Sequence, residues 1–145
     1  MLSMVEAIWH LLADGETLTV STVVTSSGSS PREVGASMVM TSSGRVLGSL
    51  SGGCLEGDVL HAAHDVMQTG TTRASMYGPV DGSDPFRVGL SCGGLIDVAT
   101  SRFTPDVAAV FARLHDAVSA HQAAAVVTDI GGDPGTPGVM GYDGR

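Results

Sequence analysis

The chain has 145 residues, 43% of them hydrophobic and 15% charged, which is enough for one compact domain with a buried core. Its formal charge is −8, with seven arginines and no lysine, so a broad cationic surface for nucleic acid cannot be assembled. No apolar run reaches the roughly 18 residues of a membrane span, and the first ten residues lack the pattern of a signal peptide. We expect a soluble, cytoplasmic protein that binds neither nucleic acid nor membranes.

The first half of the chain is predicted to form a helix, a strand and a hairpin. Apolar residues recur at helical spacing over 4–13, and a glycine stop follows. The run 18–26 is rich in Val and Thr and predicts a largely buried strand. After a loop over 28–35, two short apolar runs around 42–44 predict a hairpin, since glycine supplies the positive φ of a tight turn.

The second half is predicted to alternate helices and strands. The spacing indicates a helix over 55–69, a strand near 72–77 and another over 95–103, with a turn-rich loop over 79–89. The sequence Thr104-Pro105-Asp106 is typical of a helix start. The apolar stripe of that helix is Val107, Val110, Phe111, Leu114 and Val118. A further strand is expected over 123–130.

Together these elements predict an α/β (α+β) fold. We expect a mixed sheet that contains the hairpin, about three flanking helices and no Rossmann domain, in a single compact domain over residues 1–145. Residues 104–145 repeat the opening helix, strand, glycine loop and hairpin in weak form. The repeat stops before its next strand, which favours a short or truncated form.

Cys54 follows Ser51-Gly52-Gly53, between a predicted strand and a predicted helix start. Unpaired N–H groups and the positive end of the helix dipole favour an anion or a thiolate there. The alternative is a small, buried apolar residue in a tight turn. Gly52-x-Cys54-x-x-Gly57 also imitates a dinucleotide fingerprint, but the strand before it belongs to a hairpin, so we reject that interpretation.

Glu56 lies in the first turn of the same predicted helix, two residues from Cys54. At about 100° per residue it projects to the apolar side of the helix, away from His61 and His64. A carboxylate in that position needs a partner. The alternative is an ordinary first-turn acid that local N–H groups satisfy.

Cys92 lies in a second segment of small residues, Leu90-Ser91-Cys92-Gly93-Gly94, which is nearly a mirror image of the first. If the sheet brings the two segments together, both thiols and their glycine turns line one pocket; otherwise they are unrelated tight turns. The two cysteines are 38 positions apart with no CxxC spacing, which gives little support to structural zinc or a disulfide scaffold.

The loop over 28–35 adds hydroxyl groups and a cation. Arg32 could pair with a phosphate while serines such as Ser30 donate hydrogen bonds, and Arg87 is placed similarly in the loop over 79–89. For each arginine, a solvated surface position is the alternative. The five histidines show no ligand spacing that indicates a metal site.

Three motifs, GSSPR-x-x-G, GS-x-SGGC-x-EG and GL-x-CGG-x-ID, follow one another in this order. With them, roughly residues 5–103 resemble the amino-terminal domain of the XdhC/CoxI family. Members of that family are accessory proteins of molybdenum hydroxylases such as xanthine dehydrogenase and carbon monoxide dehydrogenase. They bind the molybdenum cofactor, protect it while its sulfido ligand is installed, and pass it to the apoenzyme. The resemblance therefore implies a cofactor chaperone rather than an enzyme, with molybdopterin as bound cargo.

The resemblance also implies a set of cofactor-binding residues and partners. Cys54 and Cys92 would contact the cofactor, and metal only through its molybdenum. The other members of the predicted cofactor-binding set are Gly52, Gly53, Gly93, Gly94, Glu56, Ser30 and Arg32. The expected partner is a molybdenum hydroxylase client, with a sulfurtransferase and a second copy of the chain as further candidates.

Two other functions stay open on the residues alone. A small thiol-dependent transferase or redox protein would use Cys54 as nucleophile and Cys92 as the resolving thiol. A docking scaffold would use its glycine loops only to contact the client enzyme. Longer family members carry a carboxy-terminal Rossmann-type domain, for which these 145 residues leave no room.

Overall fold

A five-stranded sheet forms the centre of the computed structural model, which describes residues 4–29, 32–79, 89–128 and 140–142. The strand order is β3-β2-β1-β5-β4. The strands are β1 (Leu18–Ser27), β2 (Ser37–Thr41), β3 (Val46–Gly48), β4 (Arg73–Tyr77) and β5 (Leu95–Phe103). The helices are α1 (Val5–Ala13), α2 (Glu56–Thr69) and α3 (Ala108–Ser119), and β6 (Ala125–Val127) pairs with β7 (Met140–Tyr142).

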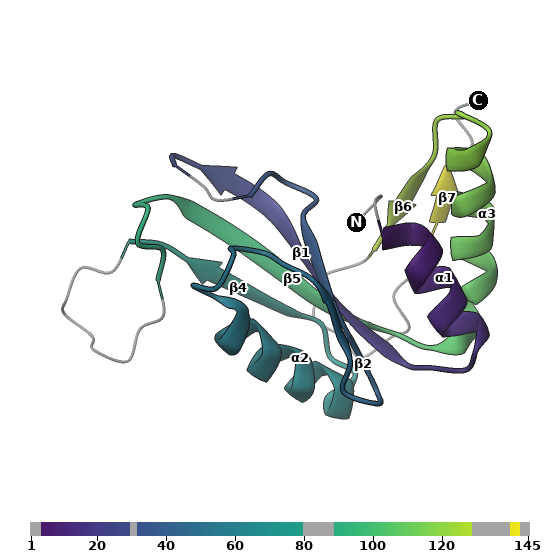
Figure 1. Cartoon of the computed structure of the whole chain (residues 1–145), viewed down its shortest axis with the longest axis horizontal. Helices are drawn as coiled ribbons and strands as arrows, with labels where there is room; N and C mark the ends of the chain where they lie inside the picture. The colour runs from purple at the N-terminus through teal and green to yellow at the C-terminus, as the bar shows by residue number, and fades with distance from the viewer. Residues whose placement is uncertain (1–3, 30–31, 80–88, 129–139, 143–145) are drawn as a thin grey trace.

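The predicted α/β class, with its hairpin and three flanking helices, is confirmed (Figure 1). One detail of the prediction is wrong, because every pairing among the described strands is antiparallel and the sheet is not mixed. The reason lies in the α2 connection. It joins β3 and β4, which run in the same direction but lie at opposite edges of the sheet and so never pair.

Helix α2 packs on one face of the sheet. Its Val59 contacts a cluster that includes Val23 of β1, Ile96 of β5 and Tyr77 of β4. Leu50 and Leu55 belong to the same cluster and are both fully buried. Because these two leucines stand on either side of the Ser51–Cys54 segment, burial holds both ends of that segment against the sheet.

Helices α1 and α3 lie side by side on the other face, over one end of the sheet (Figure 1). Ile8 and Phe111 pack there against Leu18 and Phe103, which are opposite each other in the β1–β5 register. Val118, predicted in the buried stripe of α3, is 44% exposed, since the last turn of the helix lies outside this cluster.

The carboxy-terminal part is less regular than predicted. The helix starting near Thr104 begins as a 3₁₀ turn, Pro105–Val107, before α3. The strand expected over 123–130 is described only as Ala125–Val127. The glycine loop of the weak repeat lies outside the described residues. Among the residues that are described, no helix combines the length and the apolar character needed to cross a membrane.

Candidate functional site

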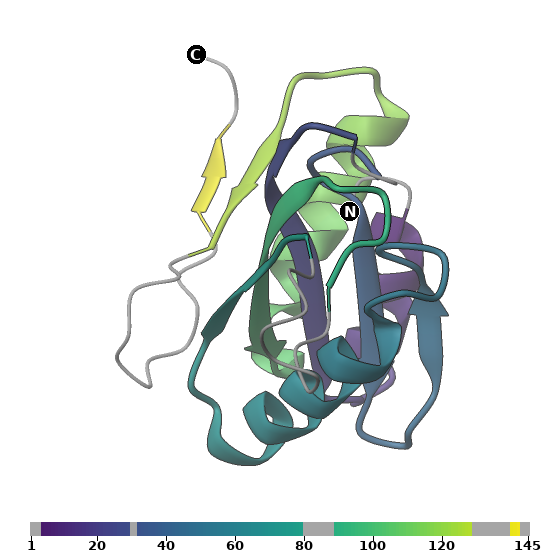
Figure 2. The same cartoon turned by 90° about the vertical axis from the view of Figure 1, so that its left-hand side faces the viewer.

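Three glycine-containing segments meet at one end of the sheet. Ser27 at the end of β1 is opposite Leu95 at the start of β5, so the loop after β1 lies beside the segment before β5. A Cβ atom added to Gly28 would lie 3.5 Å from the Cα atom of Gly94. The segment before α2 reaches the same place, because the thiol of Cys54 is 3.9 Å from the hydroxyl of Ser91. Figure 2 looks onto this end of the sheet.

The structure thus brings the two Gly-Cys segments into contact, although they are far apart in the sequence. Cys54 and Cys92 are both free thiols and both exposed. Cys54 is therefore not the small buried residue of the alternative interpretation. Its side chain points out of the α2 start toward Ser91 of the second segment, where a ligand or another protein can reach it.

The half-buried side chain of Glu56 folds back, and its carboxylate contacts the segment that precedes its own helix. Its Oε1 atom accepts hydrogen bonds from the Ser49 hydroxyl (2.8 Å) and from the N–H groups of Leu50 (3.0 Å), Ser51 (2.8 Å) and Gly52 (3.0 Å). Its Oε2 atom accepts them from the Ser51 hydroxyl (2.5 Å) and the N–H groups of Gly53 (2.8 Å) and Leu55 (3.3 Å). Glu56 therefore has the partners that its position required, and they are the local N–H groups of the alternative interpretation together with two serine hydroxyl groups.

These bonds keep Glu56 ionised. Partial burial by itself would raise the pKa of the Glu56 carboxyl. The donors from Ser51, Ser49 and Gly53 outweigh that effect and hold the pKa well below its usual range. At neutral pH the start of α2 thus carries a fixed negative charge, with Asp58 as a second acid in the same turn.

Glycine is required in both turns by backbone conformation. Gly52, Gly53 and Gly93 have φ of +80°, +128° and +76°, a backbone conformation that residues with a Cβ atom rarely adopt. A Cβ atom on any of the three would meet nothing within 4 Å among the described residues. Crowding is therefore not the reason for glycine at these positions, and the outer side of each turn is open to a ligand.

The remaining predicted site residues contribute less to this geometry. Ser30 and Arg87 lie outside the described residues. Arg32 is exposed in the loop that follows Gly28. Gly94 is buried beside Gly28 and serves the close approach of the two segments.

Sequence reasoning missed the roles of several neighbours. It gives Ser49, Ser51 and Ser91 no function, yet the hydroxyl groups of Ser49 and Ser51 bind Glu56, and Ser91 contacts Cys54. The spacing of a serine pair and a glutamate around Gly-Gly was the signal for this network. Near the same end, Thr25 donates a 2.5 Å hydrogen bond to Asp97 across the β1–β5 pair.

Tyr77 and Asp58 connect the start of α2 to the edge strand β4. The Tyr77 hydroxyl donates a 2.6 Å hydrogen bond to Asp58. Burial, followed by the hydrogen bond and charge of Asp58, raises the pKa of Tyr77 to about 12. The tyrosine therefore stays protonated and ties the first turn of α2 to the sheet.

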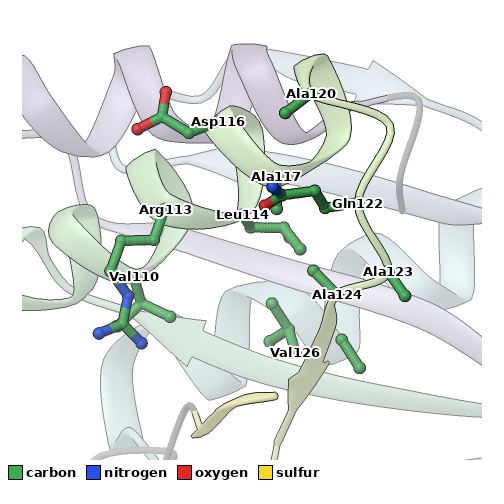
Figure 3. Close-up of a pocket in the computed structure, with 11 residues that line it drawn as sticks. Val110, Arg113, Leu114, Asp116, Ala117, Ala120, Gln122, Ala123, Ala124 and Val126 are labelled. Atoms are coloured by element: carbon green, nitrogen blue, oxygen red, sulfur yellow. The ribbon is translucent and has the colours of Figure 1, made fainter. Parts of the chain in front are cut away.

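A separate hollow of about 530 Å³ lies between α3 and β6 (Figure 3). Alanines line much of it, with Arg113 and Asp116 at its side. It is far from the Gly-Cys segments, at the α1 and α3 end of the molecule (Figure 1). None of the predicted site residues lines it. Within the described part of the chain, no group of three His, Cys, Asp or Glu is placed to hold a metal ion directly.

The chain is similar to several known proteins over most of its length. It is 31% identical over 121 residues to a probable xanthine dehydrogenase subunit of Bacillus subtilis (strain 168), covering 83% of this chain and 37% of that protein. It is 37% identical over 83 residues to the molybdenum cofactor insertion chaperone PaoD from Escherichia coli (strain K12), covering 57% of this chain and 26% of PaoD.

The chain is also similar to a protein of known structure. A crystal structure of a xanthine dehydrogenase from Bacillus halodurans superposes with a TM-score of 0.69 at 28% identity, over 88% of this chain and 39% of that chain. The present chain thus spans well under half the length of these proteins. Residues 11–78, which include Cys54 and Glu56 but end before Cys92, match the XdhC and CoxI family. This chain is a member of the XdhC and CoxI family.

Proposed function

We propose that this chain binds the molybdenum cofactor where its two Gly-Cys segments meet and passes it to a molybdenum hydroxylase. The observation that carries the proposal is the exposed thiol of Cys54, 3.9 Å from the Ser91 hydroxyl of the second segment. The likeness to PaoD, whose name describes a molybdenum cofactor insertion chaperone, supports the same function.

The chemistry of the segments fits this cargo. Thiolates are good ligands for soft metal centres, and the cofactor presents a dithiolene-bound molybdenum. Cys54 and Cys92 are exposed, so a bulky cargo can reach them and leave again. The open backbone at Gly53 and Gly93 lets a flat ring system approach closely. A carrier must release what it binds, and a surface site with few side-chain walls suits that task better than a closed cavity.

The client and the other partners belong to the proposal as well. The names of the Bacillus relatives favour a client of the xanthine dehydrogenase type. A sulfurtransferase and a second copy of the chain are further candidate partners, and the cytoplasm is the proposed compartment. We also propose that the residues of this chain act as one domain, with Cys54 and Cys92 in one site.

The test is to purify the protein anaerobically from a host that makes molybdopterin and to measure bound pterin and molybdenum. Both should be present in the wild type. Cys54→Ala and Cys92→Ala should each lower occupancy about tenfold, the effect of losing ~1.4 kcal/mol of binding. Ser119→Ala, an exposed change at the end of α3, is the matched control and should leave occupancy unchanged.

Two results would contradict parts of the proposal. A wild-type protein with neither pterin nor molybdenum would exclude the carrier function and favour a docking scaffold or a thiol-transfer protein. The thiol-transfer interpretation would then require a mixed disulfide on Cys54, which mass spectrometry detects. Full occupancy in both cysteine variants would remove the thiols from the site and leave the carrier function intact.

A further inference from the structure

The Ser49–Leu55 segment has the form of an anion-binding turn. Five backbone N–H groups and two serine hydroxyl groups converge on one point at the start of α2. Such concave arrangements of N–H groups at a helix start commonly bind phosphate or another anion. Here the anion is the protein's own Glu56 carboxylate, four residues after Gly52 in the chain.

The charges at this point leave no attraction for a second anion. The positive end of the α2 dipole amounts to about half an elementary charge, and Glu56 and Asp58 both lie in the first turn. The N–H groups of four consecutive residues from Leu50 to Gly53 are all directed at Glu56. A phosphate would have to displace a carboxylate that is already bound and ionised, or sit against its negative charge.

The carboxylate accounts for five fixed positions of the GS-x-SGGC-x-EG motif, namely the two serines, the Gly52-Gly53 pair and Glu56 itself. Ser49 and Ser51 donate hydroxyl hydrogen bonds to it, and Gly52 and Gly53 adopt the positive φ that turns their N–H groups toward it. Leu55 is buried and its N–H also donates to the Ser51 hydroxyl at 2.9 Å. Cys54 is different, because its side chain leaves the turn and points toward Ser91.

We propose that Glu56 is an internal anion that permanently occupies the anion-binding turn, so that the segment presents the Cys54 thiol to its cargo and not its backbone amides. This inference rests on the proposed function for the identity of the cargo. Glu56 is then a positioning residue, which acts through Cys54 and does not touch the cofactor. The anionic groups of the cargo bind elsewhere, and this segment meets the metal end.

The first test uses the wild type without any cofactor. Inorganic phosphate is titrated into isotope-labelled protein, and the amide resonances of Leu50, Ser51, Gly52 and Gly53 are followed by NMR. They should not shift, because Glu56 already holds these groups. Saturable shifts of the Gly52 and Gly53 resonances would overturn the proposal, since they would show that the turn accepts an external anion in the native protein.

The second test empties the turn. In Glu56→Ala the N–H groups lose their acceptor, so phosphate or formate should bind there and raise Tm by about 4 °C or more. The wild type should show no such rise. Glu16→Ala is the matched control, because Glu16 also accepts hydrogen bonds from two serines, Ser42 and Ser43, but lies outside the α2 start. An anion that raises Tm equally in all three proteins would contradict a specific site.

The third test measures the position of Cys54 through its chemistry. In a Cys92→Ala background, the alkylation rate of Cys54 by iodoacetamide should change in Glu56→Ala and return toward the wild-type rate when formate is added. The Glu56→Gln variant should also differ from the wild-type rate. Its amide group places N–H donors where the backbone already supplies donors. An alkylation rate that Glu56→Ala leaves unchanged would overturn the positioning role. None of these readouts needs the molybdenum cofactor, so their failure is separate from failure of the carrier function.

Discussion

The thiol of Cys54 and the hydroxyl of Ser91 are 3.9 Å apart, although 37 positions separate them in the chain. The β1–β5 pairing places the Ser91 segment at this end of the sheet, and the buried Leu50 and Leu55 hold the Cys54 segment beside it. The contact is therefore a result of the tertiary structure. It should be lost if either the β1–β5 pairing or the burial of the two leucines is disrupted.

Ser91→Cys in a Cys92→Ala background should form an intramolecular disulfide with Cys54 under mild oxidation. The two sulfur atoms need to approach to about 2.05 Å, which small side-chain rotations at these exposed positions allow. Mass spectrometry after proteolysis would detect the crosslinked peptides. The Cys92→Ala parent has a single thiol and serves as the control. A folded double variant whose Cys54 stays alkylatable after oxidation would mean that the segments do not meet.

Glu56→Gln should lower the free energy of unfolding at pH 7 by about 1–3 kcal/mol, because the partly exposed carboxylate loses charge-assisted hydrogen bonds. The pKa of Glu56 is lowered in the folded state. Its ionisation therefore stabilises the fold fully above the unfolded pKa of about 4.3, and this contribution is lost as the pH falls from there toward the folded pKa. Urea unfolding should show the gap between wild type and variant narrowing on acidification. A gap that stays constant from about pH 7 to pH 3 would argue against the network.

Gly70→Ala should destabilise the protein by about 1–2 kcal/mol, the cost of a left-handed conformation in a residue with a Cβ atom. Gly70 ends α2 with φ of +77°, and its added Cβ would press on the Arg102 guanidinium group, which donates to the Met67 carbonyl at 3.1 Å. Gly57→Ala is the matched control. It lies inside α2 with no neighbour near the new Cβ among the described residues, so it should gain about 0.4–1 kcal/mol. Equal effects of the two changes in urea unfolding would contradict this account.

Thr19→Val should raise the free energy of unfolding by about 1 kcal/mol. The Thr19 hydroxyl is fully buried and finds no hydrogen-bond partner in the described part of the chain, so removing it relieves a desolvation cost. The same change at Thr100 should have the opposite sign, because the Thr100 hydroxyl lies 2.9 Å from that of buried Ser21. Thermal unfolding of the two variants under one condition gives the comparison. Destabilisation by Thr19→Val would point to a partner for its hydroxyl.

The periodicity of the chain was sufficient to predict most of the elements. Helix α1, the β2–β3 hairpin and strand β5 lie where the residue pattern placed them, because helical spacing, a glycine turn and a run of β-branched and apolar residues are local features. The direction of the strands was not predictable in the same way. A mixed sheet and an antiparallel sheet bury the same side chains, and only the crossing of α2 from one edge to the other decides between them.

The sequence by itself determined the segment types, the family and the need of Glu56 for a partner, since these depend on local pattern and residue chemistry. Only the tertiary structure decided which groups meet. It placed Cys54 against Ser91, and it turned the N–H groups of Gly52 and Gly53 toward Glu56. The first outcome depends on strand register, which brings together two groups that are 37 positions apart in the chain. The second depends on the backbone dihedral angles of one short segment, which the residue pattern alone does not specify.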